Sequence, residues 1–586
     1  MDLFVPRRLA AADLLTSECF DCQEGFGDGV FQRRLLILSA VTIFLLDGHA
    51  ALLPVISRDV DHWCKRPAAY NVSADAWKNY AIPVGADGRH SRCYVFENLG
   101  DSPNDTDAVV ECYEWDYDQA QASTSVISVW NMVCRRRLLL AVTMAVQNVG
   151  SGAFLLLSGA AADLFGRMPV HLVAATATIA STVAGCLTTN YALYTLAQFF
   201  ASGGAAVSSA VTVLVCFEVT VHEHRPLYLI FAATASFFLA DLWFAINRSL
   251  QISWALVQAV YLSPTLLLLA TFAVAQESPR WLIAKGRLEE AEAVMLLAAE
   301  MNRFPFAGTS CLLDKLMLKR GHWKHRNGAA SSTVEEGPLL DAVSVRRRAL
   351  IMFAVLFSLM FAVFTDVIST MVRTDKSEGS SGLFMGVQFA GGLLSYAVMH
   401  TAVTRFALVK VLRVALMVAG LAHCVLSFVV SFSPAVTVLL ALSRGILIVA
   451  IVISVAYVME MVPTAVRGVA LCWELASGHI GALCASATLV LHQLGREDVA
   501  FATAALLLLM SLFATSDLPT STAVECMVAN AATRRRPSVS SKVSIDHMKK
   551  TLEQGGKGSR STARSRRSLS EVSLRSFSVH SDAQRF

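Results

Sequence analysis

Two long apolar runs, at residues 138–158 and 169–187, constrain the fold more than any other feature of the chain. Neither contains an Asp, Glu, Lys or Arg, and each is close to the ~20 residues with which a helix crosses a bilayer. The short segment from Gly159 to Arg167 between them allows only a tight reversal, so we expect two antiparallel neighbouring helices. Gly159 and the alanines after it would let these helices approach closely. Asp163 and Arg167 would mark the basic, cytoplasmic side of the turn.

Similar apolar runs recur along the chain. The sequence is 55% hydrophobic and 16% charged, whereas soluble domains carry ~25% charged residues. We therefore predict an all-α membrane protein with twelve transmembrane helices in two six-helix bundles. The runs lie at about 35–56, 138–160, 169–188, 191–217, 226–246 and 252–274, and then at 348–371, 382–402, 408–430, 435–459, 466–491 and 498–515.

The runs divide the chain into five predicted segments. No signal peptide is visible, because the first residues are polar. The segments are a cytoplasmic N-terminal segment (1–34), an N-terminal bundle (35–274) with an extracellular loop (57–134), a cytoplasmic connector (275–347) with helical character near 288–301, a C-terminal bundle (348–515) and a disordered Ser/Arg-rich cytoplasmic tail (516–586). Two tail sites, at 535–538 and 566–570, are typical of basophilic kinase substrates, although a basic tail is also drawn to anionic lipid.

The loop at 57–134 has the composition of an extracellular cap. It contains two acceptor sequons, at Asn71 and Asn104, and four cysteines, Cys64, Cys93, Cys112 and Cys134. Clustered cysteines and sequons together favour a glycosylated, disulfide-bonded segment. Four cysteines allow three pairings, and the sequence leaves all three open. Cys19 and Cys22 have no second ligand pair nearby, so we expect no metal site.

Lys and Arg in the flanks of the runs set the predicted orientation. They gather on the side of the N-terminal segment, the connector and the tail, which places both termini in the cytoplasm. The run Arg135–Arg137 disagrees, because it would lie outside. The other flanks outnumber it, and the sequons of the long loop agree with them.

A charge pattern repeats between the two predicted bundles. Glu218 and Arg225 bracket the end of the fourth run seven residues apart, and Glu460 and Arg467 bracket the end of the tenth at the same spacing. Equivalent helix ends in two halves are typical of parallel-repeat transporters, which bind substrate between the repeats. With Asp163 and Arg167, these four residues would form a cytoplasmic gate.

Several motifs resemble one family. The segments Cys112–Asp118 and Val126–Cys134 resemble the end of the first extracellular loop of the organic cation/anion/carnitine transporters of the major facilitator superfamily. Asp61–Cys64 resembles the start of that loop. The other matching segments are Gly159–Arg167, which includes Gly166, the Glu277–Ile283 signature after helix six, which includes Arg280, and Met461–Arg467 at the entry to helix eleven.

The resemblance covers about residues 35–520 and implies the rest of the architecture. It implies twelve helices, cytoplasmic termini, a plasma-membrane location and alternating access around a central cavity. It also implies movement of small organic ions without ATP hydrolysis, and it predicts no cofactor.

The chain departs from the family pattern at several positions. Leu164 and Met168 replace basic residues of the loop between helices two and three. Gln198 stands near a position that is usually basic. His479 lies twelve residues after Arg467. At this position the cation-transporting members of the family appear with an acidic residue and the anion-transporting members with an arginine. These departures put the strength of the gate and the substrate charge in doubt.

Ionisable groups inside the apolar runs are costly and are therefore candidates for substrate contact. Those we single out are Asp47, Asp241, Asp366, Arg444, Glu474 and His479. Asp47, Asp366 and Arg444 could instead lie near helix ends or pair between helices. Glu474 and His479 are about 140° apart around one helix, so we expect only one of them to line a cavity. His479 is the preferred candidate, because a solvated imidazole titrates near neutrality.

Aromatic and polar residues complete the predicted substrate site. Phe353, Phe357, Phe361 and Phe364 share one face of the seventh run. They would contact an organic cation if that face lines the cavity, or lipid and neighbouring helices if it does not. Gln198 and Tyr457 are further candidates.

The sequence therefore predicts a facilitator of small organic ions, with a cation or a zwitterion such as carnitine favoured over an anion. No phosphate-binding loop, His-Glu-x-x-His motif or nucleophile elbow is present, so we expect neither an enzyme nor a nucleic-acid-binding protein. The main alternative is a transport-silent relative that acts as a receptor or scaffold. A sugar-type facilitator is a second alternative, against which the large cysteine-bearing loop argues. The sequence leaves the oligomeric state open.

Overall fold

The computed structural model describes residues 26–519 except 68–71, 86–87, 89, 98–107, 119–124, 222–223, 251, 275, 305–341, 377–389, 392, 395–396, 399 and 430–433. All of these described residues fall within the first of the two units of the chain, Met1–Met527. The sequons at Asn71 and Asn104, the Cys19/Cys22 pair and the kinase motifs of the tail lie outside the described residues.

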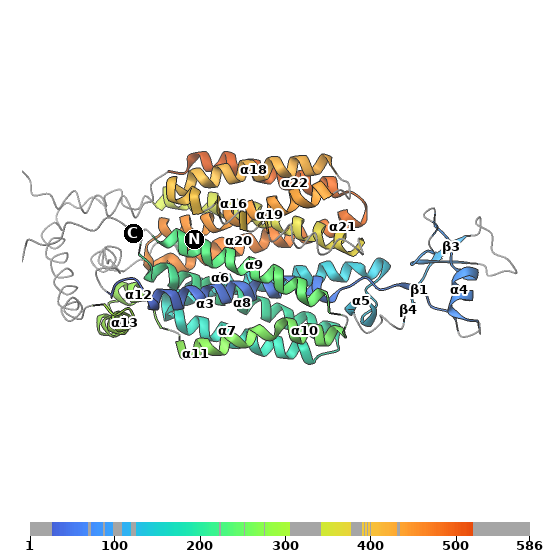
Figure 1. Ribbon diagram of the computed structural model, residues 1–586, viewed down its shortest axis with the longest axis horizontal. Coiled ribbons are helices and arrows are strands. Elements are labelled where there is room, and N and C mark those ends of the chain that lie inside the picture. The colour runs from blue at the N-terminus through green and yellow to red at the C-terminus, as the bar shows by residue number, and fades with distance from the viewer. Residues whose placement is uncertain are drawn as a thin grey trace, which may run out of the picture. The chain divides into compact units, whose positions relative to one another are not determined.

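The N-terminal half consists of membrane-length helices joined by short turns (Figure 1). Gly166, with φ of 116°, separates two of them, and the Asn190 side chain caps another by accepting the N–H groups of Ala192 and Leu193. The helices are α3 (Val30–Ile56), α6 (Leu138–Phe165), α7 (Arg167–Leu187), α8 (Tyr191–Val219), α9 (Arg225–Arg248) and α10 (Trp254–Leu262), the last continued by η3 (Ser263–Ala270) and α11 (Thr271–Val274).

Two boundaries in this half differ from the predictions. Helix α3 begins at Val30 rather than near residue 35, because first-turn amides find partners: Gln32 accepts the N–H of Gly29 and Asn302 accepts that of Phe31. The sixth run is not one α-helix. It changes to a 3₁₀ segment at Ser263, where Pro264 lacks the N–H that an α-helix needs.

The C-terminal half has the same construction. Its elements are α16 (Ala342–Lys376), α18 (Leu408–Phe428), α19 (Pro434–Met461), η5 (Thr464–Val466), α20 (Arg467–Ser486), α21 (Thr488–Gln493), α22 (Glu497–Ala514) and η6 (Thr515–Asp517). Within the described residues, eleven helices are long and apolar enough to cross a membrane. The predicted helix at 382–402 falls where only some residues are described, and those from 390 onward are helical. The all-α membrane fold is confirmed.

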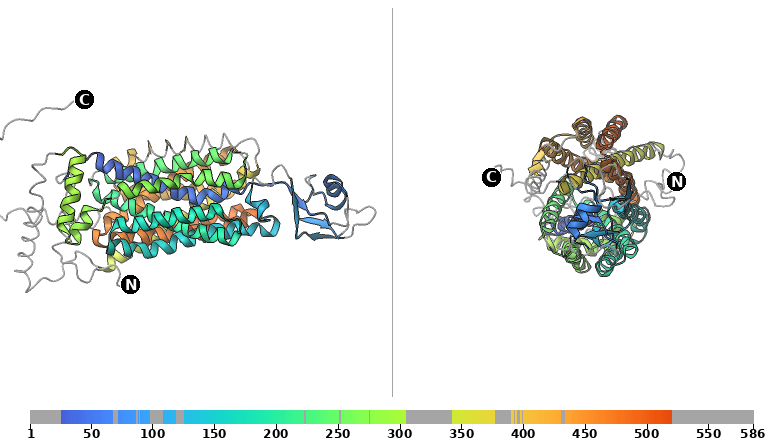
Figure 2. Two further views of the ribbon diagram at one scale, coloured as in Figure 1. Left: turned by 90° about the horizontal axis from the view of Figure 1, so that it is seen from below. Right: turned by 90° about the vertical axis from the view of Figure 1, so that its right-hand side faces the viewer.

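Short elements stand at the two ends of these helices (Figure 2). The connector helices α12 (Pro279–Ala284) and α13 (Leu288–Met301) lie at one end, here called the connector end. The predicted helical stretch at 288–301 is thereby confirmed. The strands of the long loop lie beyond the opposite end, here called the loop end.

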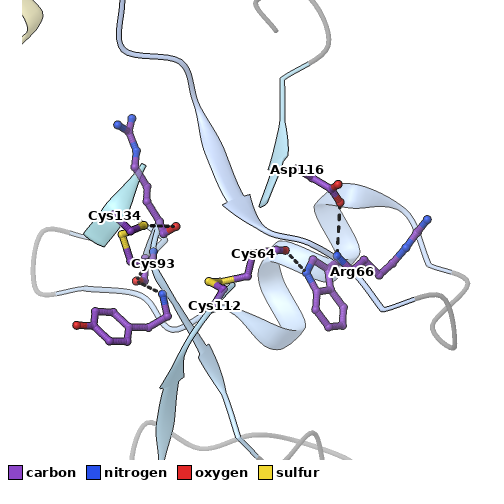
Figure 3. The surroundings of a disulfide bond; sticks show 10 residues. Cys64, Arg66, Cys93, Cys112, Asp116 and Cys134 are labelled. Atoms are coloured by element: carbon purple, nitrogen blue, oxygen red, sulfur yellow. Dashed lines mark hydrogen bonds between the residues drawn. A yellow bond between two sulfur atoms is a disulfide. The ribbon is translucent and has the colours of Figure 1, made fainter. Parts of the chain in front are cut away.

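The loop contains two small antiparallel sheets (Figure 3). Strand β1 (His62–Cys64) pairs with β4 (Trp115–Tyr117), and β2 (Tyr94–Phe96) pairs with β3 (Val109–Glu111). Helices α4 (Ala74–Ala81) and α5 (Val126–Val129) accompany them. Of the three pairings that the sequence left open, the structure has Cys64–Cys112 and Cys93–Cys134. Each disulfide links segments more than 40 residues apart, so both strengthen a loop with little core of its own.

Candidate functional site

Two adjoining cavities lie between the halves. The larger, of about 180 Å³, is lined from the first half by α3, α6, α8 and α9 and from the second by α16, α19 and α20. The smaller, of about 150 Å³, extends along α3, α9 and α19 to Pro54 and Arg248 near the loop end. Both include Asp47, Met360 and Phe364. One water needs ~10–15 Å³ of such space, so there is room for a small organic molecule.

Amide and imidazole side chains form a polar strip in the larger cavity. His479 of α20 has its Nδ1 3.1 Å from Oδ1 of Asn148 on α6, which joins the two halves. Gln147, one residue earlier, donates to the carbonyl of His49 and to Oε1 of Gln198, each at 3.2 Å. The rest of the lining is mostly aliphatic and aromatic. This combination of apolar walls with a few directed polar groups is typical of ligand sites.

An ion pair crosses the smaller cavity. Arg444 Nη2 on α19 lies 2.9 Å from Oδ1 of Asp241 on α9. Asp47 of α3 lines the same cavity and interacts electrostatically with both residues. All three side chains therefore line one space between the halves.

The structure brings five of the predicted candidates to these cavities, namely Asp47, Asp241, Phe364, Arg444 and His479. The described cavities do not include the other candidates. The backbone of Phe357 lies against Gly481 of α20, and Phe361 is buried in an apolar core to which both halves contribute. The expectation that Glu474 and His479 do not both line the cavity agrees with their placement.

The remaining predicted residues have partners inside one half. Glu474 is buried and accepts the Ser454 hydroxyl at 2.6 Å. Asp366 lies 3.3 Å from His423 and accepts the Ser443 hydroxyl. Tyr457 is buried in the core and donates to the Pro519 carbonyl. Gln198 does not line the described cavities, but it accepts hydrogen bonds from Gln147 and Ser202, which do.

At the connector end, four of the predicted gate residues form a buried ion cluster between the halves. Arg167 lies 2.9 Å from Asp163 and 3.0 Å from Glu218. Arg467, from the other half, lies 3.6 Å from Glu218. Arg167 also donates to the Thr464 carbonyl at 2.8 Å. No side chain of this cluster is more than 8% exposed, so its charges are shielded from water.

The backbone of the second half completes this contact. Asp163 accepts the N–H groups of Gly468 and Val469, at 3.1 and 2.8 Å, in the first turn of α20. Gly159 faces the same turn so closely that an added Cβ would lie 2.8 Å from the Gly468 carbonyl oxygen. The connector end is therefore closed to within van der Waals contact.

The connector supports the cluster from outside. Glu277 accepts the N–H of Met168 at 3.1 Å, and Trp281 of α12 donates to the Asp163 carbonyl. Burial raises the pKa of Glu277. The guanidinium groups of Arg225 and Arg467 both stack over the Phe217 ring. The two other predicted residues are also buried, Glu460 in α19 and Arg280 in α12.

Two amide residues that line the larger cavity are not among the residues predicted from the sequence. Gln147 and Asn148 interrupt the apolar run at 138–160, and that interruption was the available signal.

In the described loop, His62 lies close to Cys93 and Cys134 at a spacing that would suit a metal. The two sulfurs are joined in a disulfide, so they do not offer thiolate ligands.

The chain is similar to membrane transporters. The family model "Sugar (and other) transporter" matches residues 106–363. The mouse protein "Solute carrier family 22 member 7" is 28% identical over 311 residues, 50% of this chain and 57% of the relative. "Organic cation transporter protein" of Drosophila melanogaster is 25% identical over 341 residues, 56% of this chain and 60% of the relative. The mouse "Organic cation/carnitine transporter 2" is 25% identical over 47% of this chain and 52% of the relative.

These matches span just over half the length of the curated relatives. Among solved structures, the proton:xylose symporter XylE of the major facilitator superfamily, bound to 6-bromo-6-deoxy-D-glucose, aligns with a TM-score of 0.55 at 15% identity. The alignment covers 85% of this chain and 99% of the symporter, and it concerns the fold alone.

Proposed function

Because the chain has the major facilitator fold and is related to the organic cation and anion transporters of that superfamily, we propose that it carries small organic ions across the plasma membrane by alternating access. It would do so without chemistry on the substrate, as expected for a transporter rather than an enzyme. The connector end would face the cytoplasm, and the disulfide-bonded loop would face outside.

One observation supports this function most directly: a cavity between the halves lies beside an end that is sealed by ions from both halves. The cavity has polar groups from both halves, and Arg467 of one half meets Glu218 of the other at the connector end. Opening the connector end would require the cluster to separate, and water entering there could solvate the parted charges. The described arrangement would correspond to a state closed toward the cytoplasm.

The substrate we favour is an organic cation or zwitterion. Relatives with matching sequence include proteins named for organic cations and for carnitine. The described cavities contain carboxylates of Asp47 and Asp241 as well as apolar and aromatic walls, which suit an ion with an alkyl surface.

Uptake by cells that express the full chain tests the proposal. Radiolabelled tetraethylammonium, L-carnitine and para-aminohippurate would be compared in cells with and without the protein, with surface biotinylation as the control for delivery. We expect uptake of at least one cationic or zwitterionic probe above the empty-vector level. A protein that reaches the surface but moves none of the probes would favour the receptor or scaffold alternative.

A further inference from the structure

The charged groups of the smaller cavity are unevenly paired. Arg444 and Asp241 form a direct ion pair across the halves, at 2.9 Å. Asp47 lies in the wall that the two cavities share, and its Oδ2 is buried with no hydrogen-bond partner among the described residues. Two carboxylates therefore depend on one guanidinium.

The other charged residue of this lining is Arg248, which ends α9 near the loop end and donates to the carbonyl of Pro54. The electrostatic partners of Asp47 are instead Arg444, which is attractive, and Asp241, which is repulsive. An unpaired carboxylate in a membrane-embedded cavity is costly unless a cation reaches it.

The walls around Asp47 indicate what kind of cation fits. Phe237, Phe364 and Met360 line both cavities, and none of them offers a carbonyl or carboxylate oxygen from its side chain. Such walls suit the alkyl surface and the diffuse charge of a quaternary ammonium group, for which aromatic faces add cation–π attraction. These three side chains offer no oxygen acceptor to the N–H donors of a primary amine.

Building on the transport function proposed above, we propose that Asp47, Asp241 and Arg444 form a recognition site for an alkylammonium group. The ammonium group pairs with the Asp47 carboxylate, whose Oδ2 has no hydrogen-bond partner among the described residues, while the ion pair of Arg444 with Asp241 stays formed beside it. With both acids ionised, the three residues carry a net charge of −1, which the ammonium group neutralises.

Binding to the purified full-length protein in detergent tests this site separately from transport. The probes are the tetraalkylammonium ions from methyl to butyl, L-carnitine as a zwitterion and para-aminohippurate as an anion, each titrated by thermal shift. We expect at least one tetraalkylammonium ion to bind more tightly than the anion. Binding of L-carnitine as well would show that the ammonium group may belong to a zwitterion.

Three variants locate the site. Asp47→Asn is expected to weaken tetraalkylammonium binding by about 10-fold or more, as for the loss of a charged partner. The double variant Asp241→Asn/Arg444→Gln removes one negative and one positive charge together, so the net charge of the site is unchanged; it should weaken binding less than Asp47→Asn. Asp498→Asn removes the same single charge at an exposed position paired with Arg496, and we expect unchanged binding.

Tighter binding of the anion than of every cation would overturn the site, and so would cation affinity that Asp47→Asn leaves unchanged in a folded protein. If the variants behave as expected but wild-type proteoliposomes take up no probe, the site stands and the transport function fails. If only the anion is taken up, transport stands and the site is wrong.

Discussion

Single side chains acquire different roles in this protein through their position around one helix. Glu474 and His479 are five residues apart on α20, yet Glu474 bonds to Ser454 inside its own half and His479 meets Asn148 of the other. The free-energy cost of placing an ionisable group inside an apolar helix does not distinguish their roles, because both residues incur it. The direction in which each points decides which one lines the cavity.

His479 is expected to tune selectivity. We predict that His479→Ala changes the ratio of cation to anion uptake several-fold, because it removes a hydrogen-bonding group worth about 1 kcal/mol from the cavity. Uptake of tetraethylammonium and para-aminohippurate, normalised to surface protein, measures this ratio. Asn148→Ala should change it in the same sense. Ratios equal to wild type in both variants would remove this strip from the substrate site.

The burial of Glu277 leads us to predict that the free energy of unfolding depends on pH. Burial raises its pKa above 4.5, although Arg167 and the N–H groups of Ser278 and Met168 oppose the rise. The fold thus favours the protonated carboxyl, so its contribution to stability is complete below the unfolded-state pKa and is lost as the pH rises through the folded-state pKa. The variant Glu277→Gln stays neutral.

We therefore expect the thermal midpoint of wild type to fall relative to Glu277→Gln between about pH 4 and about pH 7. Thermal unfolding of both proteins in the same detergent measures the difference. A difference that is constant over this range would contradict the assignment.

Helices α6 and α20 owe their closeness to glycine. A Cβ at Gly159 would lie 2.8 Å from the Gly468 carbonyl oxygen and 2.9 Å from Cβ of Cys472, whereas a Cβ at Gly48 of α3 would have no neighbour within 4 Å. Both glycines lie inside helices, so replacing either by alanine gains about 1 kcal/mol of helix propensity. Only the contact between the halves distinguishes the two positions.

The matched pair Gly159→Ala and Gly48→Ala tests whether this contact matters for closure. We predict that Gly159→Ala lowers the maximal rate of uptake, since α6 and α20 cannot return to contact without a shift, and that Gly48→Ala leaves it near wild type. Initial uptake rates and surface biotinylation are the measurements. Equal rates in the two variants would mean that closure tolerates a wider gap.

Across the two halves, the buried ions hold the connector end shut. Asp163 joins Arg167 to two amides of α20, and Arg467 adds a contact with Glu218. Removing one member of a buried ion pair costs about 3–5 kcal/mol, which is enough to shift a two-state equilibrium from one extreme toward the other.

Asp163→Asn should therefore open the connector end. Cys472 of α20 is buried beside Gly159 in the closed arrangement, so its alkylation reports on separation there. We expect maleimide to modify Cys472 faster in Asp163→Asn than in wild type, measured by mass spectrometry of the purified protein. Exposed Cys484 serves as the internal control, and equal modification of Cys472 in both proteins would exclude opening.

Much of this architecture is predictable from sequence because lipid restricts a spanning segment to few conformations. The apolar runs therefore gave helix positions, and the repeated Glu–Arg spacing indicated residues that meet at the connector end. The pair Asp241–Arg444 was not predictable, because it depends on how α9 and α19 are rotated about their axes. Around the axis of α16, Phe357 and Phe361 are offset from Phe364 by a few tens of degrees. This offset places Phe364 in the cavity and the other two in packed surroundings.

Asp163 accepts hydrogen bonds from two backbone N–H groups, and this affects which residues evolution can substitute. The donors on α20 are backbone N–H groups, which every residue type except proline has. Position 469 can thus drift among amino acids without losing its donor, while position 468 is restricted by size, since a Cβ there would lie 2.8 Å from the Asp163 carboxylate. Selection is expected to fall on the acid and the glycine because of this contact, whereas position 469 is restricted only by the burial of its side chain.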